Sequence, residues 1–182
     1  MVYVFLAGGF EEIEAVSSID ILRRAGLDVT TVCVGSEPFV AGAHGMIVKA
    51  DKNISELDLT ERPEMLVFPG GATSTERMLF NKRMENYILT VAADESVKVA
   101  AICAAPSVIG FYGLLRGRRA TCYPGFEDRL IGAIRADEPV VRDGRFLTAV
   151  GPGVSIEFAL AAVEMICGKE KADEIAKAMQ VQ

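Results

Sequence analysis

The chain has 182 residues, of which 51% are hydrophobic and 24% charged, and its formal net charge is −6. This length and apolar content predict a folded domain with a sizeable core, and they exclude an intrinsically disordered chain. The excess of acidic residues argues against nucleic acid or an anionic membrane surface as the main partner.

Strands and helices alternate along the first part of the chain. The predicted elements are a strand at 2–7 that ends at Gly8-Gly9, a helix at 11–25 closed by Gly26, a strand at 29–34, short strands within 35–50, and a buried strand at 65–68. The first strand, helix and strand form a β-α-β unit, which favours a parallel sheet.

The alternation continues to the end of the chain. The predicted elements are a helix that opens with a capping box at 73–76 and places Phe80, Met84, Tyr87, Ile88 and Val91 on one face, a strand at 97–102, a helix from Ala104 with Pro106 in its first turn, a short strand at 119–123, a hairpin at 140–148 with an Asp143-Gly144 turn, and helices at 155–166 and 169–179. We therefore expect one doubly wound α/β domain over residues 1–182, with a mostly parallel sheet and helices on both faces. Sites in such sheets form at the carboxyl ends of the strands.

Cys103 lies at the junction between a predicted buried strand and the helix that follows it. A sharp strand-to-helix turn pushes its side chain out of the sheet edge, as in a nucleophile elbow. The helix N-terminus favours negative charge, so we expect a lowered thiol pKa and a reactive thiolate. The alternative is a small buried hydrophobic residue, which is how most free cysteines behave.

Two further loops are expected at the same edge of the sheet. Gly70-Gly71 follows a buried strand, and its backbone N–H groups could form an oxyanion hole or only a tight turn. Glu14 shares a helical face with Ile21, so an inward carboxyl with a raised pKa could hydrogen-bond a sulfur or move a proton, although a structural role explains it equally well. Glu11 and Glu12 are interpreted as first-turn acids that match the helix dipole.

His44 is the only histidine, so a Cys-His catalytic pair would have to use it. It lies in the glycine-rich segment 41–45, which either reaches the site or faces solvent, and the residue after Cys103 is alanine. The sequence has no G-x-G-x-x-G or Walker loop and no H-E-x-x-H cluster. We therefore expect neither a nucleotide cofactor nor a metal ion.

The cysteines at positions 33, 103, 122 and 167 are far apart and form no C-x-x-C pair, which predicts neither a disulfide framework nor a zinc site. Cys33 is expected in a buried strand and Cys167 on an apolar helix, so both should be inert. The chain starts without a basic leader segment, and proline and glycine interrupt its apolar span at 99–115. We expect a cytoplasmic protein with no membrane-spanning segment.

Four blocks of sequence, which span nearly the whole chain, resemble one known family. They are Gly9-Phe-Glu-Glu-Ile-Glu14-Ala, Phe68-Pro-Gly-Gly71, Ala100-Ala-Ile-Cys103-Ala-Ala-Pro106 and Gly151-Pro-Gly-Val-Ser-Ile-Glu-Phe-Ala-Leu160. In this order they resemble the ThiJ/PfpI superfamily, in particular the branch that contains the Parkinson-disease-associated protein deglycase and YajL. The cysteine block and the last block are specific to that family, whereas Pro-Gly-Gly alone is a weak signal.

The resemblance implies a flavodoxin-like sandwich, related to the class I glutamine amidotransferases, that forms a homodimer. It implies Cys103 as the nucleophile and Glu14 as the protonated carboxyl that hydrogen-bonds its sulfur. The implied oxyanion donors are the backbone amides of Gly70, Gly71 and Ala104. Members of the family are described as glutathione-independent glyoxalases, as deglycases that act on methylglyoxal adducts, and as redox-responsive chaperones.

Two positions depart from the pattern of that branch. Tyr123 takes the place of a histidine that commonly precedes the following proline, and a phenol is a far weaker base than imidazole at neutral pH. His44 falls where the branch often carries arginine. Proton transfer would therefore depend on Glu14, and a glutamine amidotransferase, which needs a Cys-His-Glu triad, is disfavoured.

We therefore expect an enzyme in which Cys103 attacks small α-oxoaldehydes, or their adducts on proteins and amines, while Glu14 moves the proton. The alternative is a non-enzymatic peroxide sensor or redox-regulated chaperone, in which Cys103 is oxidised to a sulfinate that Glu14 holds. Turnover separates the two hypotheses, because an enzyme forms product catalytically whereas a sensor reacts once.

Overall fold

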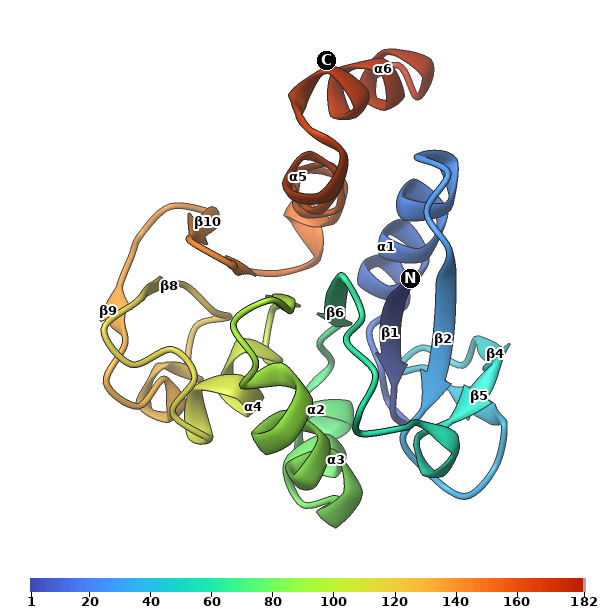
Figure 1. Ribbon diagram of the computed structural model, residues 1–182, viewed down its shortest axis with the longest axis vertical. Helices are drawn as coiled ribbons and strands as arrows, with labels where there is room; N and C mark the ends of the chain where they lie inside the picture. The colour runs from blue at the N-terminus through green and yellow to red at the C-terminus, as the bar shows by residue number, and fades with distance from the viewer. Residues whose placement is uncertain (182) are drawn as a thin grey trace.

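The computed structural model describes residues 1–181, and its centre is a seven-stranded sheet (Figure 1). In spatial order the strands are β10 (Val140–Asp143), β11 (Phe146–Ala149), β7 (Lys98–Ile102), β6 (Met65–Phe68), β1 (Val2–Leu6), β2 (Val29–Cys33) and β5 (Lys52–Asn53). Only β10 runs antiparallel to its neighbour. The central strands are apolar runs because a parallel sheet is buried on both faces.

Helices cover both faces of the sheet, as the doubly wound fold requires (Figure 1). On one face lie α1 (Glu12–Arg24), α5 (Ser155–Cys167) and α6 (Lys169–Ala178). On the other lie α2 (Ala72–Leu79), α3 (Lys82–Tyr87), a π-helical turn (Ile88–Ala92) and α4 (Pro106–Phe111). Alternate residues of β1 serve the two layers, since Val4 packs with the first group and Phe5 with the second. The predicted flavodoxin-like fold class is confirmed.

Several smaller elements lie outside the seven-stranded sheet. They are the hairpin of β3 (Phe39–Ala41) and β4 (Ile47–Lys49), the parallel pair of β8 (Arg119–Ala120) and β9 (Ile134–Arg135), and 3₁₀ turns at Ile54–Glu56, Glu127–Arg129 and Pro152–Val154. The short strands expected within 35–50 are therefore present. In the described part of the chain, no helix combines the length and apolar character needed to cross a membrane.

Local signals in the sequence were reliable where the backbone follows a standard motif. Gly26 ends α1 with a left-handed φ of 81°, and β10 and β11 form the predicted hairpin around Gly144. The strand expected at 119–123 is shorter, because β8 ends at Ala120.

The capping box predicted at 73–76 is wrong. Gly71 adopts a φ of 93° at the N-cap and makes no side-chain cap, so α2 already begins at Ala72. The long apolar face predicted beyond it also breaks, because Asn81 caps a new helix by accepting the amides of Arg83 and Met84. Phe80 lies at this break and is 77% exposed rather than buried.

Candidate active site

Three segments that are far apart in the sequence meet at the carboxyl edge of the sheet. They are the first turns of α1 with Glu14, the loop after β6 with Gly70, and the junction after β7 with Cys103. A Cβ atom placed on Gly70 would lie 2.6 Å from the Cys103 Cβ and 2.8 Å from Glu14 Oε2. Glycine is therefore required at position 70, and the cysteine and the glutamate lie side by side around it.

Cys103 occupies a strained elbow, as the sequence predicts. Its φ is 63°, a left-handed value that few non-glycine residues adopt. The turn is held on both sides, because the Cys103 N–H donates to the Ala149 carbonyl over 2.9 Å and the Cys103 carbonyl accepts from the Tyr123 N–H over 2.8 Å. The side chain is buried, with 8% of the residue exposed. Strain of this kind persists where the surroundings fix it, which is common at functional sites.

Glu14 points inward and is fully buried. Its Oε2 accepts the Gly70 N–H over 2.7 Å, and its Oε1 has no hydrogen-bond partner among residues 1–181. Burial raises the pKa of Glu14 to about 7, against the lowering effect of the Gly70 amide. The carboxyl can therefore give or take a proton near neutral pH, as the inward orientation predicts.

The expectation of a lowered thiol pKa at Cys103 is wrong. Burial, followed by the negative charge of Glu14, raises the pKa of Cys103 to about 12. The nearby backbone N–H groups of Gly71 and Ala104 lower the pKa of the sulfur, but they do not offset burial. The helix behind the thiol, α4, has only six residues and begins at Pro106, so its dipole is weak. The thiol is therefore the resting form, and Glu14 is the neighbouring group that can remove its proton.

Of the three backbone amides expected as oxyanion donors, one already has a partner. The Gly70 N–H is taken by Glu14, which withdraws it from the set of expected oxyanion donors. The amides of Gly71 and Ala104 both lie close enough to the sulfur to lower its pKa. Position 71 requires glycine, because a Cβ at this position would lie 2.2 Å from the Gly9 carbonyl oxygen. Two of the three expected donors therefore remain available near the reactive atom.

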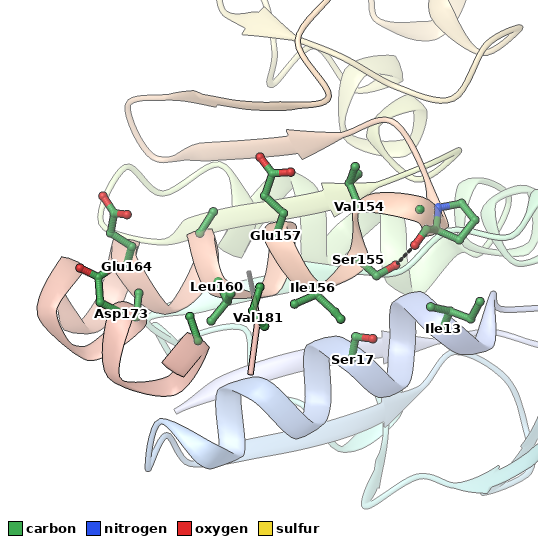
Figure 2. Close-up of a pocket in the computed structure, with 15 residues that line it drawn as sticks. Ile13, Ser17, Val154, Ser155, Ile156, Glu157, Leu160, Glu164, Asp173 and Val181 are labelled. Carbon is green, nitrogen blue, oxygen red and sulfur yellow. Dashed lines mark hydrogen bonds between the residues drawn. The ribbon is translucent and has the colours of Figure 1, made fainter. Parts of the chain in front are cut away.

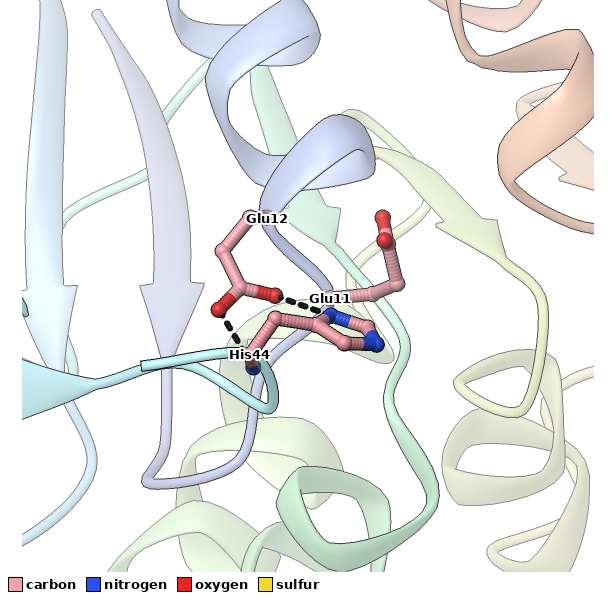
Figure 3. A group of neighbouring side chains, drawn as sticks. All are labelled: Glu11, Glu12 and His44. Atoms are coloured by element: carbon pink, nitrogen blue, oxygen red, sulfur yellow. Dashed lines mark hydrogen bonds and ion pairs between the residues drawn. The ribbon is translucent and has the colours of Figure 1, made fainter. Parts of the chain in front are cut away.

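Tyr123 and His44 do not complete a Cys-His arrangement. Tyr123 is 46% exposed, its N–H contacts the Cys103 carbonyl, and its ring lies over Gly151. The His44 side chain is largely exposed, and its Nδ1 lies 2.9 Å from Glu12 Oε2 (Figure 3). The structure thus pairs the single histidine with a glutamate of α1.

Glu11 and Glu12 have roles beyond the first-turn acids that the sequence predicts. Glu11 is the N-cap of α1 and accepts the Glu14 N–H over 2.8 Å, so it fixes the backbone that carries Glu14. Glu12 is buried and accepts the His44 backbone N–H over 2.6 Å. Glutamate is an uncommon N-cap, and the contact with His44 joins residues 32 positions apart, so neither role had a local signal.

The other three thiols have different environments. Cys33 is buried and its Sγ donates to the Glu37 carbonyl over 2.9 Å, which agrees with an inert residue. Cys122 is buried, and burial raises its pKa to about 11. Cys167 lies on the predicted apolar helix, but it is the last residue of α5 and is exposed, so burial does not protect it as it protects Cys33.

A large groove lies away from this chemistry, between α1, α5 and α6 (Figure 2). It has a volume of about 660 Å³ and is lined by apolar side chains such as Ile13, Ile156 and Val181, with Glu157 and Asp173 among the polar ones. None of the predicted site residues lines it. Since a reaction needs a nucleophile and an acid or base, the candidate active site is the smaller cluster around Cys103.

Comparison with known proteins agrees with this geometry. The chain is 38% identical over 177 residues to protein DJ-1 homolog A of Arabidopsis thaliana, which is 96% of this chain but 45% of that protein; the chain thus spans less than half of that relative. It is 33% identical over 154 residues to a deglycase of Pyrococcus abyssi, which is 84% of this chain and 90% of that protein. Oxidized DJ-1 of Toxoplasma gondii has a similar structure, with a TM-score of 0.92 at 38% identity over 98% of this chain and 97% of that one. The model described as the DJ-1/PfpI family matches residues 1–165, and the chain therefore belongs to that family.

Proposed function

We propose that the chain is a cysteine-dependent glyoxalase or protein deglycase that acts on methylglyoxal-type α-oxoaldehydes or on their adducts with proteins and amines. The observation that supports this most directly is the pairing of a strained, buried Cys103 with a fully buried Glu14 around Gly70. The similar Pyrococcus protein is named a deglycase, which supports the choice of substrate class.

The first step joins sulfur to the aldehyde carbon. Glu14 takes the thiol proton as Cys103 Sγ attacks, so the site holds one negative charge before and after the proton moves. The charge then develops on the aldehyde oxygen, where the amides of Gly71 and Ala104 can donate to it. Return of the proton to that oxygen gives a hemithioacetal. When the substrate is an adduct, the amine leaves with a proton as the carbon–sulfur bond forms, and the same hemithioacetal results.

The later steps need a base at the carbon next to the ketone. Glu14 removes the proton from the carbon bonded to sulfur and returns a proton to the neighbouring carbon, which converts the hemithioacetal to a lactoyl thioester. Water hydrolyses the thioester to lactate and restores the thiol, so the sum is methylglyoxal plus water to lactate. Because Tyr123 replaces the family histidine, Glu14 performs every proton transfer in this scheme.

A redox role for the same cysteine is the second candidate function. It is supported by the similarity to a DJ-1 structure that is named as oxidized. Peroxide would convert the Cys103 sulfur to a sulfinate, and its oxygens would meet the amides of Gly71 and Ala104 and the carboxyl of Glu14. This chemistry consumes the cysteine once instead of regenerating it.

Counting product per protein molecule separates the two functions. Methylglyoxal is incubated with the wild-type protein and with Cys103→Ser, and lactate is measured over time together with free amine from a glycated peptide. We expect many equivalents of product from the wild type and none above background from the variant. Equal product from both proteins, with circular dichroism showing that both are folded, would exclude Cys103 as the nucleophile. Less than one equivalent from the wild type would favour the redox role.

The homodimer expected from the family resemblance is also a proposal. Exposed apolar side chains on two helices that border the groove of Figure 2 support it, since Ile13 is 57% and Ile156 42% exposed. Sedimentation equilibrium should give twice the chain mass of 19.6 kDa. Replacing Ile156 with aspartate should shift the mass toward that of one chain.

A further inference from the structure

Glu11, Glu12 and His44 form a cluster of potential metal ligands at the start of α1 (Figure 3). One ligand atom from each residue lies within 4.8 Å of the others. The histidine comes from the loop between β3 and β4. This loop is tied to the segment just before α1 by the Ala43 N–H, which donates to the Phe10 carbonyl over 2.8 Å. The cluster therefore joins two segments that the fold holds at a fixed separation.

The buried carboxylate of Glu12 is positioned before any ligand arrives. Its Oε1 accepts the backbone N–H of His44, and its Oε2 lies 2.9 Å from His44 Nδ1. The loop makes room for this carboxylate with Gly42, where a Cβ would lie 2.4 Å from Glu12 Oε1. Glu11 uses Oε2 to cap α1, which leaves its Oε1 available to a ligand.

The charge and the donor atoms of the cluster indicate which class of ligand it would bind. Two glutamates and one imidazole gather here, and His44 is the only basic side chain within ion-pair distance of either glutamate in residues 1–181. A divalent cation would balance the two carboxylates. Imidazole nitrogen with carboxylate oxygen is a ligand set that suits zinc and its transition-metal neighbours better than magnesium or calcium, which prefer oxygen alone.

We propose that Glu11, Glu12 and His44 bind one divalent transition-metal ion of the zinc class. The fourth position is open to water, because the His44 side chain is 75% exposed at the protein surface. The ion would link the β3–β4 loop to α1. None of its ligands is the nucleophile or the proton carrier of the proposed reaction, so the site does not depend on the proposed function.

Calorimetric titration of chelator-treated protein with zinc chloride tests the site. We expect one equivalent to bind the wild type and Cys103→Ser alike, and binding at least about tenfold weaker in His44→Ala and in Glu12→Gln. Glu95→Gln, which changes an exposed glutamate in the loop before β7, is the matched control and should bind as the wild type does. Circular dichroism verifies folding, and His44→Ala keeps the test valid if Glu12→Gln does not fold.

Cobalt chloride distinguishes this site from the thiols. Cobalt held by nitrogen and oxygen gives only weak visible bands, whereas thiolate ligation adds an intense charge-transfer band in the near ultraviolet. We expect the weak bands alone, and we expect His44→Ala to lose them. The proposal fails if the wild type binds neither metal, if His44→Ala binds as tightly as the wild type, or if Cys103→Ser abolishes binding.

Discussion

Replacing Glu14 with glutamine should make the protein more stable and less active. At pH 8 the native state holds an ionised carboxylate that is fully buried and whose pKa is raised by burial from 4.5 to about 7. A pKa shift of one unit corresponds to about 1.4 kcal/mol, so ionising Glu14 lowers the free energy of unfolding by about 3 kcal/mol at this pH. The amide removes that penalty, its oxygen can still accept the Gly70 N–H, and its NH₂ group can donate to the Cys103 sulfur.

The direction in which stability changes with pH follows from the raised pKa of Glu14. Between pH 4.5 and about 7 the native state binds more protons than the unfolded state, so the wild type loses stability as the pH rises through that window. The advantage of Glu14→Gln should therefore be near zero at pH 4.5 and reach its full value above pH 7. For a chain of this size, about 3 kcal/mol raises the melting temperature by about 6–12 °C.

Thermal unfolding of both proteins at several pH values, with a chelator present, measures this difference. Glu95→Gln serves as the control, because it makes the same chemical change at an exposed position and should not alter the pH dependence. An equal gain at pH 5 and pH 8, or a loss of stability at pH 8, would refute the assignment of a buried carboxylate with a raised pKa to Glu14.

Two further predictions test the geometry around the cysteine. Gly70→Ala should lower the free energy of unfolding by about 1–3 kcal/mol and abolish turnover, because the new Cβ meets the Cys103 Cβ at 2.6 Å. The control is Gly153→Ala, whose Cβ meets nothing within 4 Å and which should be neutral in denaturant unfolding and activity assays. Mild peroxide should add two oxygens to Cys103 in a Cys167→Ser background, which removes the exposed competing thiol, and should leave the melting temperature unchanged or raised. Unaltered stability of Gly70→Ala would contradict the first prediction. A Cys103–Cys122 disulfide found by mass spectrometry would contradict the second.

Much of the fold could be predicted because its signals are local. The apolar run Met65–Phe68 ends at Pro-Gly-Gly, and the structure places β6 within the same bounds. Gly26 marks the end of α1 because only a residue that tolerates a positive φ fits there. The start of α2 was missed for a related reason: the left-handed Gly71 begins the helix, and no side-chain cap announces it.

The site was only partly predictable, because its properties depend on contacts across the chain. The periodicity of α1 indicated that Glu14 faces inward, and the strand-to-helix junction indicated the elbow at Cys103. The thiol pKa was misjudged because burial outweighs the short helix, and burial is set by tertiary packing. The contact between Glu12 and His44 has no signal in the local sequence, because the two residues are far apart along the chain.

The most direct test of the central claim, that Glu14 removes the Cys103 proton during catalysis, is the pH dependence of kcat/KM for methylglyoxal. It should be measured with a chelator present, for the wild type and for Glu14→Gln. A base with a pKa of about 7 predicts that kcat/KM of the wild type rises with pH and levels off above 7. Glu14→Gln should be slower by about two to four orders of magnitude and lack this rise. The same rise in both proteins, at similar rates, would contradict the account.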